Sequence, residues 1–203
     1  VVLKHAEQDA ETAHIIEKEY RDVLLIQEVP LLSFALGLLQ RQSGNVVEAI
    51  DTFERAYRSY GPDPKDPLQL RLCRALAEGY LLLDCAEDAV RVLQQGLEWA
   101  EVLAPQEAAP AAEDVMATPS RLSFYHWLAE AYAKSDQLDE AVAILGQAKA
   151  AHPFDRATGT KLADLHFRQG NLRQALAELT ELVAHYEQEN ELDRALEILQ
   201  HMA

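Results

Sequence analysis

Residues Leu122 to Asp155 read LSFYHWLAEAYAKSDQLDEAVAILGQAKAAHPFD. Two amphipathic runs lie in this stretch, joined by a polar turn at residues 134–137. In each run, apolar and small residues recur three or four positions apart, which is the spacing of one face of an α-helix. These residues are Tyr125, Leu128, Ala129 and Tyr132 in the first run and Leu138, Ala141, Leu145 and Ala148 in the second. The stretch, which Pro153 closes, therefore predicts a helical hairpin whose alanines let the two helices approach each other.

The same residues carry a family resemblance. The stretch resembles a tetratricopeptide repeat, a helix–turn–helix unit of about 34 residues. The family's pattern of a bulky residue, Leu, a small residue, Tyr, Ala, Leu, Ala and Pro is matched by Tyr125, Leu128, Ala129, Tyr132, Ala141, Leu145, Ala148 and Pro153. The resemblance implies an all-α, right-handed α-solenoid of three to four such hairpins, with an N-terminal helix and a solitary C-terminal helix.

The pattern recurs along the chain, and the interval between equivalent alanines measures what is inserted between repeats. Ala49, Ala89, Ala141 and Ala175 are separated by 40, 52 and 34 residues. The first two intervals exceed a period of about 34 residues by 6 and 18, and the third does not exceed it. Each excess coincides with a proline-rich segment, so residues 61–67 and 104–120 are predicted to be connectors.

These intervals divide the chain into four predicted segments. They are an N-terminal capping helix at 1–29, two repeats at 30–103 with the connector 61–67, an Ala/Pro/Glu-rich insertion at 104–120, and two repeats plus a final helix at 121–203. The first segment fits either a cap or the second helix of an incomplete repeat. In the final helix the alanine equivalent to Ala175 is Ala195, only 20 residues later, so this helix is either a solitary cap or the cut edge of a longer array.

Composition excludes several classes of function. The formal charge of −16 argues against nucleic acid or an anionic membrane as the partner, since both need a basic surface. Neither a secretory signal nor an apolar run of about 18 residues is visible, which favours a cytoplasmic location. The two cysteines, Cys73 and Cys85, lie in apolar helical patterns and are expected to be buried, reduced thiols.

No chemistry-bearing motif stands out. The seven histidines include no HExxH and flank no nucleophile. His14 with Glu17 and His126 with Glu130 could each share a helix face, but such pairs are common in acidic helices. We therefore expect no catalytic residue, no metal, no cofactor and no enzymatic activity.

The resemblance also implies a binding surface, because the first helix of each repeat lines the concave side of the solenoid. Residues one turn away from the packing stripe would point into that groove. By this reasoning the groove residues are Phe34, Leu38, Arg41, Arg71, Arg74, Glu78, His126, Glu130, Lys134, Asp164 and Arg168, with Leu31, Ser123, Thr160 and Phe167 beside them.

Five of these groove residues are basic and three are acidic, so an acidic protein is predicted to carry a slightly basic groove. Such a groove suits a protein or peptide partner with an acidic and an apolar segment. The favoured function is a non-enzymatic interaction scaffold. Two alternatives stay open, namely a regulatory or sensor module of a larger signalling or transcription protein, and a self-association module that forms homo-oligomers through its terminal helices.

Overall fold

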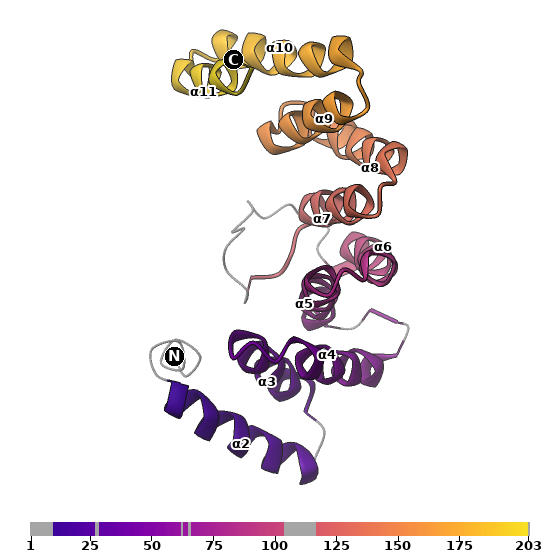
Figure 1. Cartoon of the computed structure of the whole chain (residues 1–203), viewed down its shortest axis with the longest axis vertical. Helices are drawn as coiled ribbons and strands as arrows, with labels where there is room; N and C mark the ends of the chain where they lie inside the picture. Colours follow the sequence, from indigo (N-terminus) through magenta and orange to yellow (C-terminus); the bar gives the residue numbers. More distant parts are fainter. Residues whose placement is uncertain (1–9, 27–28, 62, 65, 104–116, 203) are drawn as a thin grey trace. The chain divides into compact units, whose positions relative to one another are not determined.

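A computed structural model describes residues 10–26, 29–61, 63–64, 66–103 and 117–202 of the chain. The described residues form ten α-helices and no strand (Figure 1). The helices are α2 (Ala10–Ile26), α3 (Pro30–Gln42), α4 (Val46–Tyr60), α5 (Leu68–Leu82), α6 (Ala86–Leu103), α7 (Arg121–Lys134), α8 (Leu138–Ala151), α9 (Arg156–Arg168), α10 (Leu172–Gln188) and α11 (Leu192–Met202). The chain divides into two compact units, Val1–Phe124 and Tyr125–Ala203.

Every hairpin turns in the same way. The first helix ends in a residue with a left-handed backbone, which has a φ of 83° at Gly44, 56° at Asp84, 60° at Asp136 and 78° at Gly170. The next amide then donates to a carbonyl five residues earlier, for example from Asn45 to Gln40 at 2.8 Å and from Gln137 to Tyr132 at 2.9 Å. This hydrogen bond satisfies a carbonyl that the helix end would leave unpaired.

The alanine that sets the repeat interval follows each turn at a fixed distance. Ala49, Ala89, Ala141 and Ala175 each stand five residues after the left-handed residue, and all four are buried. An alanine there lets the second helix lie close to the first. The expected α-solenoid of tetratricopeptide-like hairpins is therefore the fold of the described residues.

Helix α10 takes part in two hairpins. Its turn into α11 has the same geometry as the others, with a φ of 59° at Asn190 and a 2.8 Å hydrogen bond from the Glu191 amide to the Tyr186 carbonyl. Leu182 and Tyr186 repeat the Leu-x-x-x-Tyr spacing that Leu128 and Tyr132 show in a first helix. The α10 core residues Ala175, Leu179, Leu182 and Tyr186 belong to one cluster with Ala163 of α9 and with Ala195 and Ile198 of α11. Thus α10 is the second helix of one hairpin and the first helix of the next.

Two expectations about the ends and the insertion fall partly outside the described residues. The N-terminal helix is present as α2, and residues 1–9 are not described. Pro30 stands at the first position of α3, where a missing amide hydrogen costs nothing. Residues 104–116 of the predicted insertion are not described.

The expectation for the cysteines was half wrong. Cys73 is buried in α5, and this burial raises the pKa of its thiol. Cys85 is exposed because α5 ends at Leu82 and the left-handed Asp84 places Cys85 in the turn. Its counterparts in the other turns are Asn45, Gln137, Asn171 and Glu191, which are all polar.

The packing of α3 on α4 generates a prediction about Gly37. A Cβ atom at Gly37 would lie 2.4 Å from the ring of Phe53, which is fully buried. We expect Gly37→Ala to lower the free energy of unfolding by about 1–3 kcal/mol through this overlap. The overlap outweighs the ~1 kcal/mol by which alanine is favoured over glycine inside a helix. Urea unfolding followed by circular dichroism measures the change.

Two controls isolate the overlap. Gly146→Ala in α8 meets no atom within 4 Å, so it should raise stability by about 0.5–1 kcal/mol. Adding Phe53→Leu to Gly37→Ala, which gives the alanine–leucine pair found in the next three hairpins, should recover part of the loss. A Gly37→Ala variant as stable as the parent would contradict this account of the packing.

Candidate functional site

The first helices of unit 1 bring a cluster of charged residues together. Arg41 of α3 and Arg74 of α5 both form ion pairs with Glu78 of α5, the latter with 2.8 Å between Arg74 Nε and Glu78 Oε1. The exposed fractions of the three side chains are only 19%, 12% and 32%. Because Arg41 lies at the end of α3 and Glu78 lies on α5, the pairing also ties the two first helices to each other.

Arg71 adds a third guanidinium to this face. It lies one turn before Arg74 on α5, and its Nη2 donates to Thr118 Oγ1 over 3.4 Å. Its Nε is buried and has no hydrogen-bond partner. We refer to Arg41, Arg71, Arg74 and Glu78 as the arginine cluster, which holds three positive charges against one negative charge. The four residues were all predicted to face the groove, and the structure places them on neighbouring helices.

The first helices of unit 2 enclose a small depression between α7 and α9. Its volume is about 150 Å³. Glu130, Asp164 and Arg168, three of the predicted groove residues, line it together with Lys161, over a floor of Ala129, Ala133, Leu145 and Leu165. Arg168 Nη2 donates to the Ala133 carbonyl at 3.0 Å, and Lys134 lies 4.0 Å from Glu130 one turn away on α7. Sequence reasoning missed Lys161, although its spacing from Asp164 and Arg168 puts it on the same face.

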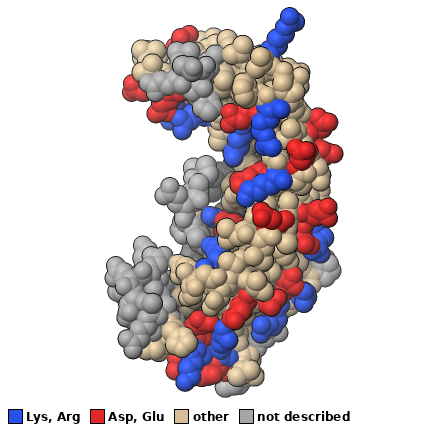
Figure 2. Space-filling model, viewed as in Figure 1, with Lys and Arg blue, Asp and Glu red and all other residues tan. Residues whose placement is uncertain are grey.

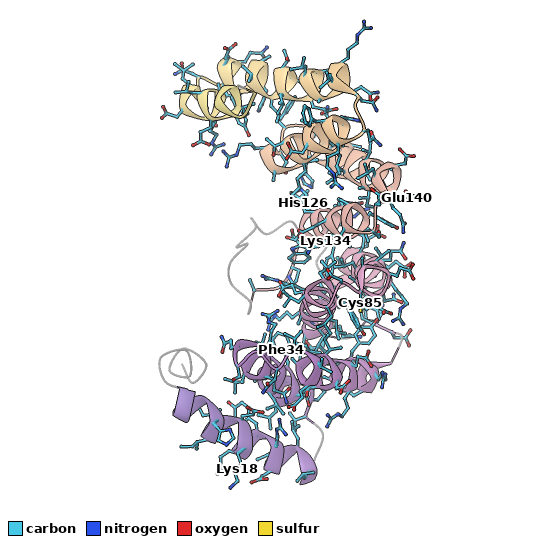
Figure 3. All side chains as sticks on the ribbon, in the orientation of Figure 1. Lys18, Phe34, Cys85, His126, Lys134 and Glu140 are labelled. Carbon is cyan, nitrogen blue, oxygen red and sulfur yellow. The ribbon has the colours of Figure 1, made fainter. Side chains whose placement is uncertain are left out.

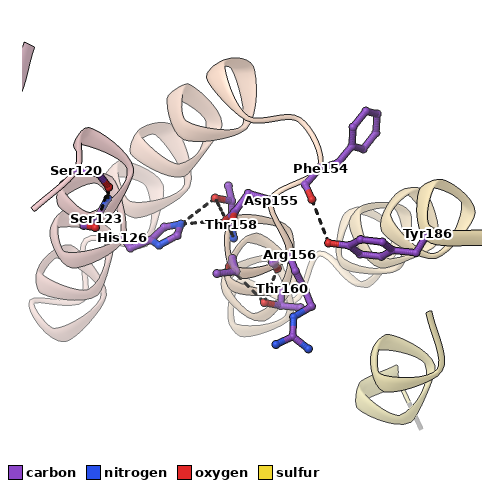
Figure 4. Close-up of polar contacts among 10 residues, drawn as sticks. Ser120, Ser123, His126, Phe154, Asp155, Arg156, Thr158, Thr160 and Tyr186 are labelled. Atoms are coloured by element: carbon purple, nitrogen blue, oxygen red, sulfur yellow. Dashed lines mark hydrogen bonds and ion pairs between the residues drawn. The ribbon is translucent and has the colours of Figure 1, made fainter. Parts of the chain in front are cut away.

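His126 is held by residues that the sequence did not single out. Its Nε2 lies 2.8 Å from Thr158 Oγ1 and 3.5 Å from Asp155 Oδ2 (Figure 4). Asp155 caps the first turn of α9, where its Oδ2 accepts from the amide of Thr158 at 2.8 Å and from its hydroxyl at 2.7 Å. His126 therefore joins α7 to the start of α9, and it does not pair with Glu130 as the helical spacing had suggested.

The environment of Asp155 stabilises its charged form. Burial by itself would raise the pKa of this carboxyl, but the hydrogen bonds from His126 and from the hydroxyl and amide of Thr158 lower it to about 2. The carboxylate therefore stays ionised well below neutral pH.

Two predicted groove residues lie in the core instead. Phe34 is 1% exposed and Leu38 is 5% exposed. The ring of Phe34, labelled in Figure 3, packs against that of Phe53 with 5.8 Å between their centroids. The prediction was wrong at these positions because α3 buries apolar residues around most of its circumference. Leu31 and Phe167 are exposed, at 53% and 67%.

Charged residues of both signs are interspersed over the visible surface (Figure 2). Many of the acidic side chains form ion pairs with a neighbour. For example, Glu178 and Glu181 of α10 both pair with Lys149 of α8, with 2.7 and 2.6 Å between their Oε2 atoms and Lys149 Nζ. The described residues contain no group of three or more His, Cys, Asp or Glu side chains that could bind a metal ion. No helix in that part of the chain is long and apolar enough to cross a membrane.

The comparisons with known proteins agree with this fold. Tetratricopeptide repeat models match residues 18–67 and 122–153. A structure of TPR-like repeats from a Podosopora anserina protein assigned as a kinesin light chain superimposes with a TM-score of 0.72 at 20% identity, covering 93% of each chain. MamA from Desulfovibrio magneticus RS-1 superimposes with a TM-score of 0.61 at 16% identity, covering 89% of this chain and 86% of that one. A search of curated proteins finds no significant match.

These observations define the class of protein to which the fold belongs. Stacked helical hairpins with small residues at their crossings define a helical-repeat protein of the α-solenoid class. The matching models then show that residues 18–67 and 122–153 carry tetratricopeptide repeats, and the similar structures share the fold of such repeats.

The Asp155 contacts generate a prediction about pH. The pKa of an aspartate in an unfolded chain is about 3.9, above the folded value of about 2. Ionised Asp155 therefore stabilises the fold at neutral pH, and this contribution is lost as the pH falls from about 4 to about 2. Asp155→Asn keeps a capping oxygen but removes the charge. We expect it to be less stable by about 1–2 kcal/mol at pH 7 and equal to the parent near pH 2.

Unfolding midpoints of the two proteins at pH 7, 4 and 2.5 measure this difference. Asp139→Asn, at an exposed position in the first turn of α8, is the matched control. An Asp155→Asn variant whose deficit is the same at every pH would contradict the assigned charge effect.

Proposed function

We propose that this chain is a non-enzymatic protein-interaction scaffold that binds a partner peptide or helix against the first helices of its hairpins. The arginine cluster of unit 1 receives an acidic group of that partner. The fold supports this proposal in general terms, since helical repeats present extended surfaces to partners. The cluster supports it in particular.

The observation that carries the proposal is the local excess of positive charge in an acidic chain. The arginine cluster holds two more positive than negative charges, whereas the whole protein has a formal charge of −16. Glu78 is shared by Arg41 and Arg74, and the buried Nε of Arg71 has no acceptor. A carboxylate of a partner would supply that acceptor and could bind a guanidinium through two hydrogen bonds.

The depression of unit 2 is a separate candidate contact for an apolar side chain of a partner. Its volume of about 150 Å³ is smaller than the roughly 300–1,000 Å³ of small-molecule pockets, so it suits one side chain rather than a whole ligand. Alanine and leucine form its floor, and charges of both signs form its rim. We infer that an aliphatic side chain enters this depression while the polar backbone of the partner stays at the rim.

Charge reversal tests the role of the arginine cluster. Peptides selected by the protein from a random display library should be rich in Asp and Glu. Arg71→Glu/Arg74→Glu should weaken their binding by at least about tenfold, because attraction becomes repulsion in a partly buried site. Fluorescence anisotropy with a selected peptide at low and high salt measures this loss.

Matched variants separate binding from folding. Arg58→Glu/Arg91→Glu reverses two arginines on the second helices α4 and α6, whose side chains are 73% and 71% exposed, and should change affinity less than about twofold. Arg71→Gln alone spares the ion pairs of Glu78 and should still weaken binding. Selected peptides without acidic residues, or affinities that the reversal leaves unchanged, would refute the proposal.

Self-association is a second candidate, which the surface of α11 favours. Leu192 and Leu196 lie one turn apart on this helix and are 61% and 54% exposed. If a second copy covers them, the mass from light scattering should rise with concentration, and Leu196→Glu should abolish the rise. Val47→Glu, at an equally exposed position on α4, is the control. A strict monomer at all concentrations would exclude this candidate.

A further inference from the structure

A cleft of about 450 Å³ lies among α2, α3 and α4 of unit 1. It is lined by α4 residues, which belong to a second helix, so it is distinct from the arginine cluster on α3 and α5. Leu24 and Leu25 of α2 and Leu36 of α3 give it an apolar side. Asp51 and Glu48 of α4, with Asp22 of α2, give it an acidic side. Its volume lies within the range of sites that bind small molecules or single side chains.

Gln40 of α3 lines the same cleft and is unusual in two respects. It is 3% exposed, and its side-chain oxygen has no hydrogen-bond partner. The backbone carbonyl of Gln40 accepts the hydrogen bond of its turn. In the other hairpins the residue with this role is aromatic, namely Tyr80, Tyr132, His166 or Tyr186. A buried acceptor without a donor is unfavourable for folding. A hydrogen-bond donor entering the cleft would remove that deficit.

The charged groups around Gln40 indicate what kind of donor fits. Asp22 and Asp51 are exposed and form no ion pair with any described residue. The cleft already accommodates one guanidinium, since Arg21 Nη2 lies 2.6 Å from Glu17 Oε1 and 2.7 Å from Glu48 Oε2. That pairing neutralises Arg21, which leaves Arg55 as the one cationic lining group without an ion pair among the described residues.

We propose that this cleft binds a primary ammonium or guanidinium group carried on an aliphatic stem. The N–H groups would donate to the Gln40 oxygen and to the carboxylates of Asp22 and Asp51. The stem would lie along the leucines, as long basic side chains do on apolar surfaces. A lysine or arginine side chain of a partner protein and a free aliphatic amine share this chemistry. The net charge of −16 favours the approach of either cation.

Titration of the isotope-labelled protein tests the site directly. The probes are N-acetyl-arginine amide and N-acetyl-lysine amide for a protein side chain, spermidine for a free amine, and N-acetyl-norleucine amide as the uncharged stem. We expect the cationic probes to shift the side-chain amide signals of Gln40 saturably, and the norleucine probe to have no effect. The source whose probe binds more tightly is the better candidate for the natural ligand.

Three variants in the cleft and one control outside it give the result its specificity. Gln40→Leu removes the acceptor and should weaken binding by about tenfold or more without loss of thermal stability, because it also removes the unsatisfied oxygen. Asp51→Asn, at an exposed position, should weaken binding with the fold unchanged. Arg55→Gln should strengthen it, whereas Asp88→Asn on α6 should have no effect. Absence of saturable shifts, or binding that Gln40→Leu and Asp51→Asn leave unchanged, would overturn the proposal, and either result leaves the arginine cluster untested and unaffected.

Discussion

A left-handed residue at the end of each first helix determines where each hairpin folds back. The residue is glycine at two of these turns and aspartate or asparagine at the others, the side chains that tolerate this backbone best. The amide of the next residue donates to a carbonyl five residues earlier, and the buried alanine follows at the same distance in every described hairpin. The register between the two helices is thus fixed locally, and the proline-rich connectors between hairpins can vary in length without disturbing it.

Sequence reasoning could predict the features that depend on this local rule. The interval between alanines located the hairpins and both proline-rich segments, and the family resemblance supplied the architecture. The rule also explains what was missed. Tyr186 already carried the signal that α10 begins another hairpin, but its helix had been assigned to the preceding repeat. Cys85 is exposed because it occupies a turn position that is polar elsewhere, which a scan for apolar periodicity does not reveal.

The candidate site was less predictable, because its contacts join residues far apart in sequence. Helical spacing placed Arg71, Arg74 and Glu78 on one face of α5, and it placed Asp164 and Arg168 on one face of α9. It could not show that Arg41 and Glu78, 37 residues apart, form an ion pair, or that His126 meets Thr158, 32 residues away. Nor could it show that Phe34 and Leu38 are buried, since both sides of α3 read as apolar. Several of the predicted groove charges, such as Arg41, Arg74 and Glu78, are paired in the structure, so the charges that stay unpaired are more informative than the total.

A departure from the repeat pattern can serve packing or function, and the surroundings of the residue indicate which. Gly37 replaces the alanine that α5, α7 and α9 have at this position, and the larger Phe53 fills the space that this change opens. That departure is compensated within the hairpin and needs no further explanation. Gln40 replaces an aromatic residue beside a cleft, and nothing among the described residues satisfies its buried oxygen. An uncompensated polar group is unfavourable for folding alone, so a donor from outside the chain is the simplest physical reason for a glutamine at this position.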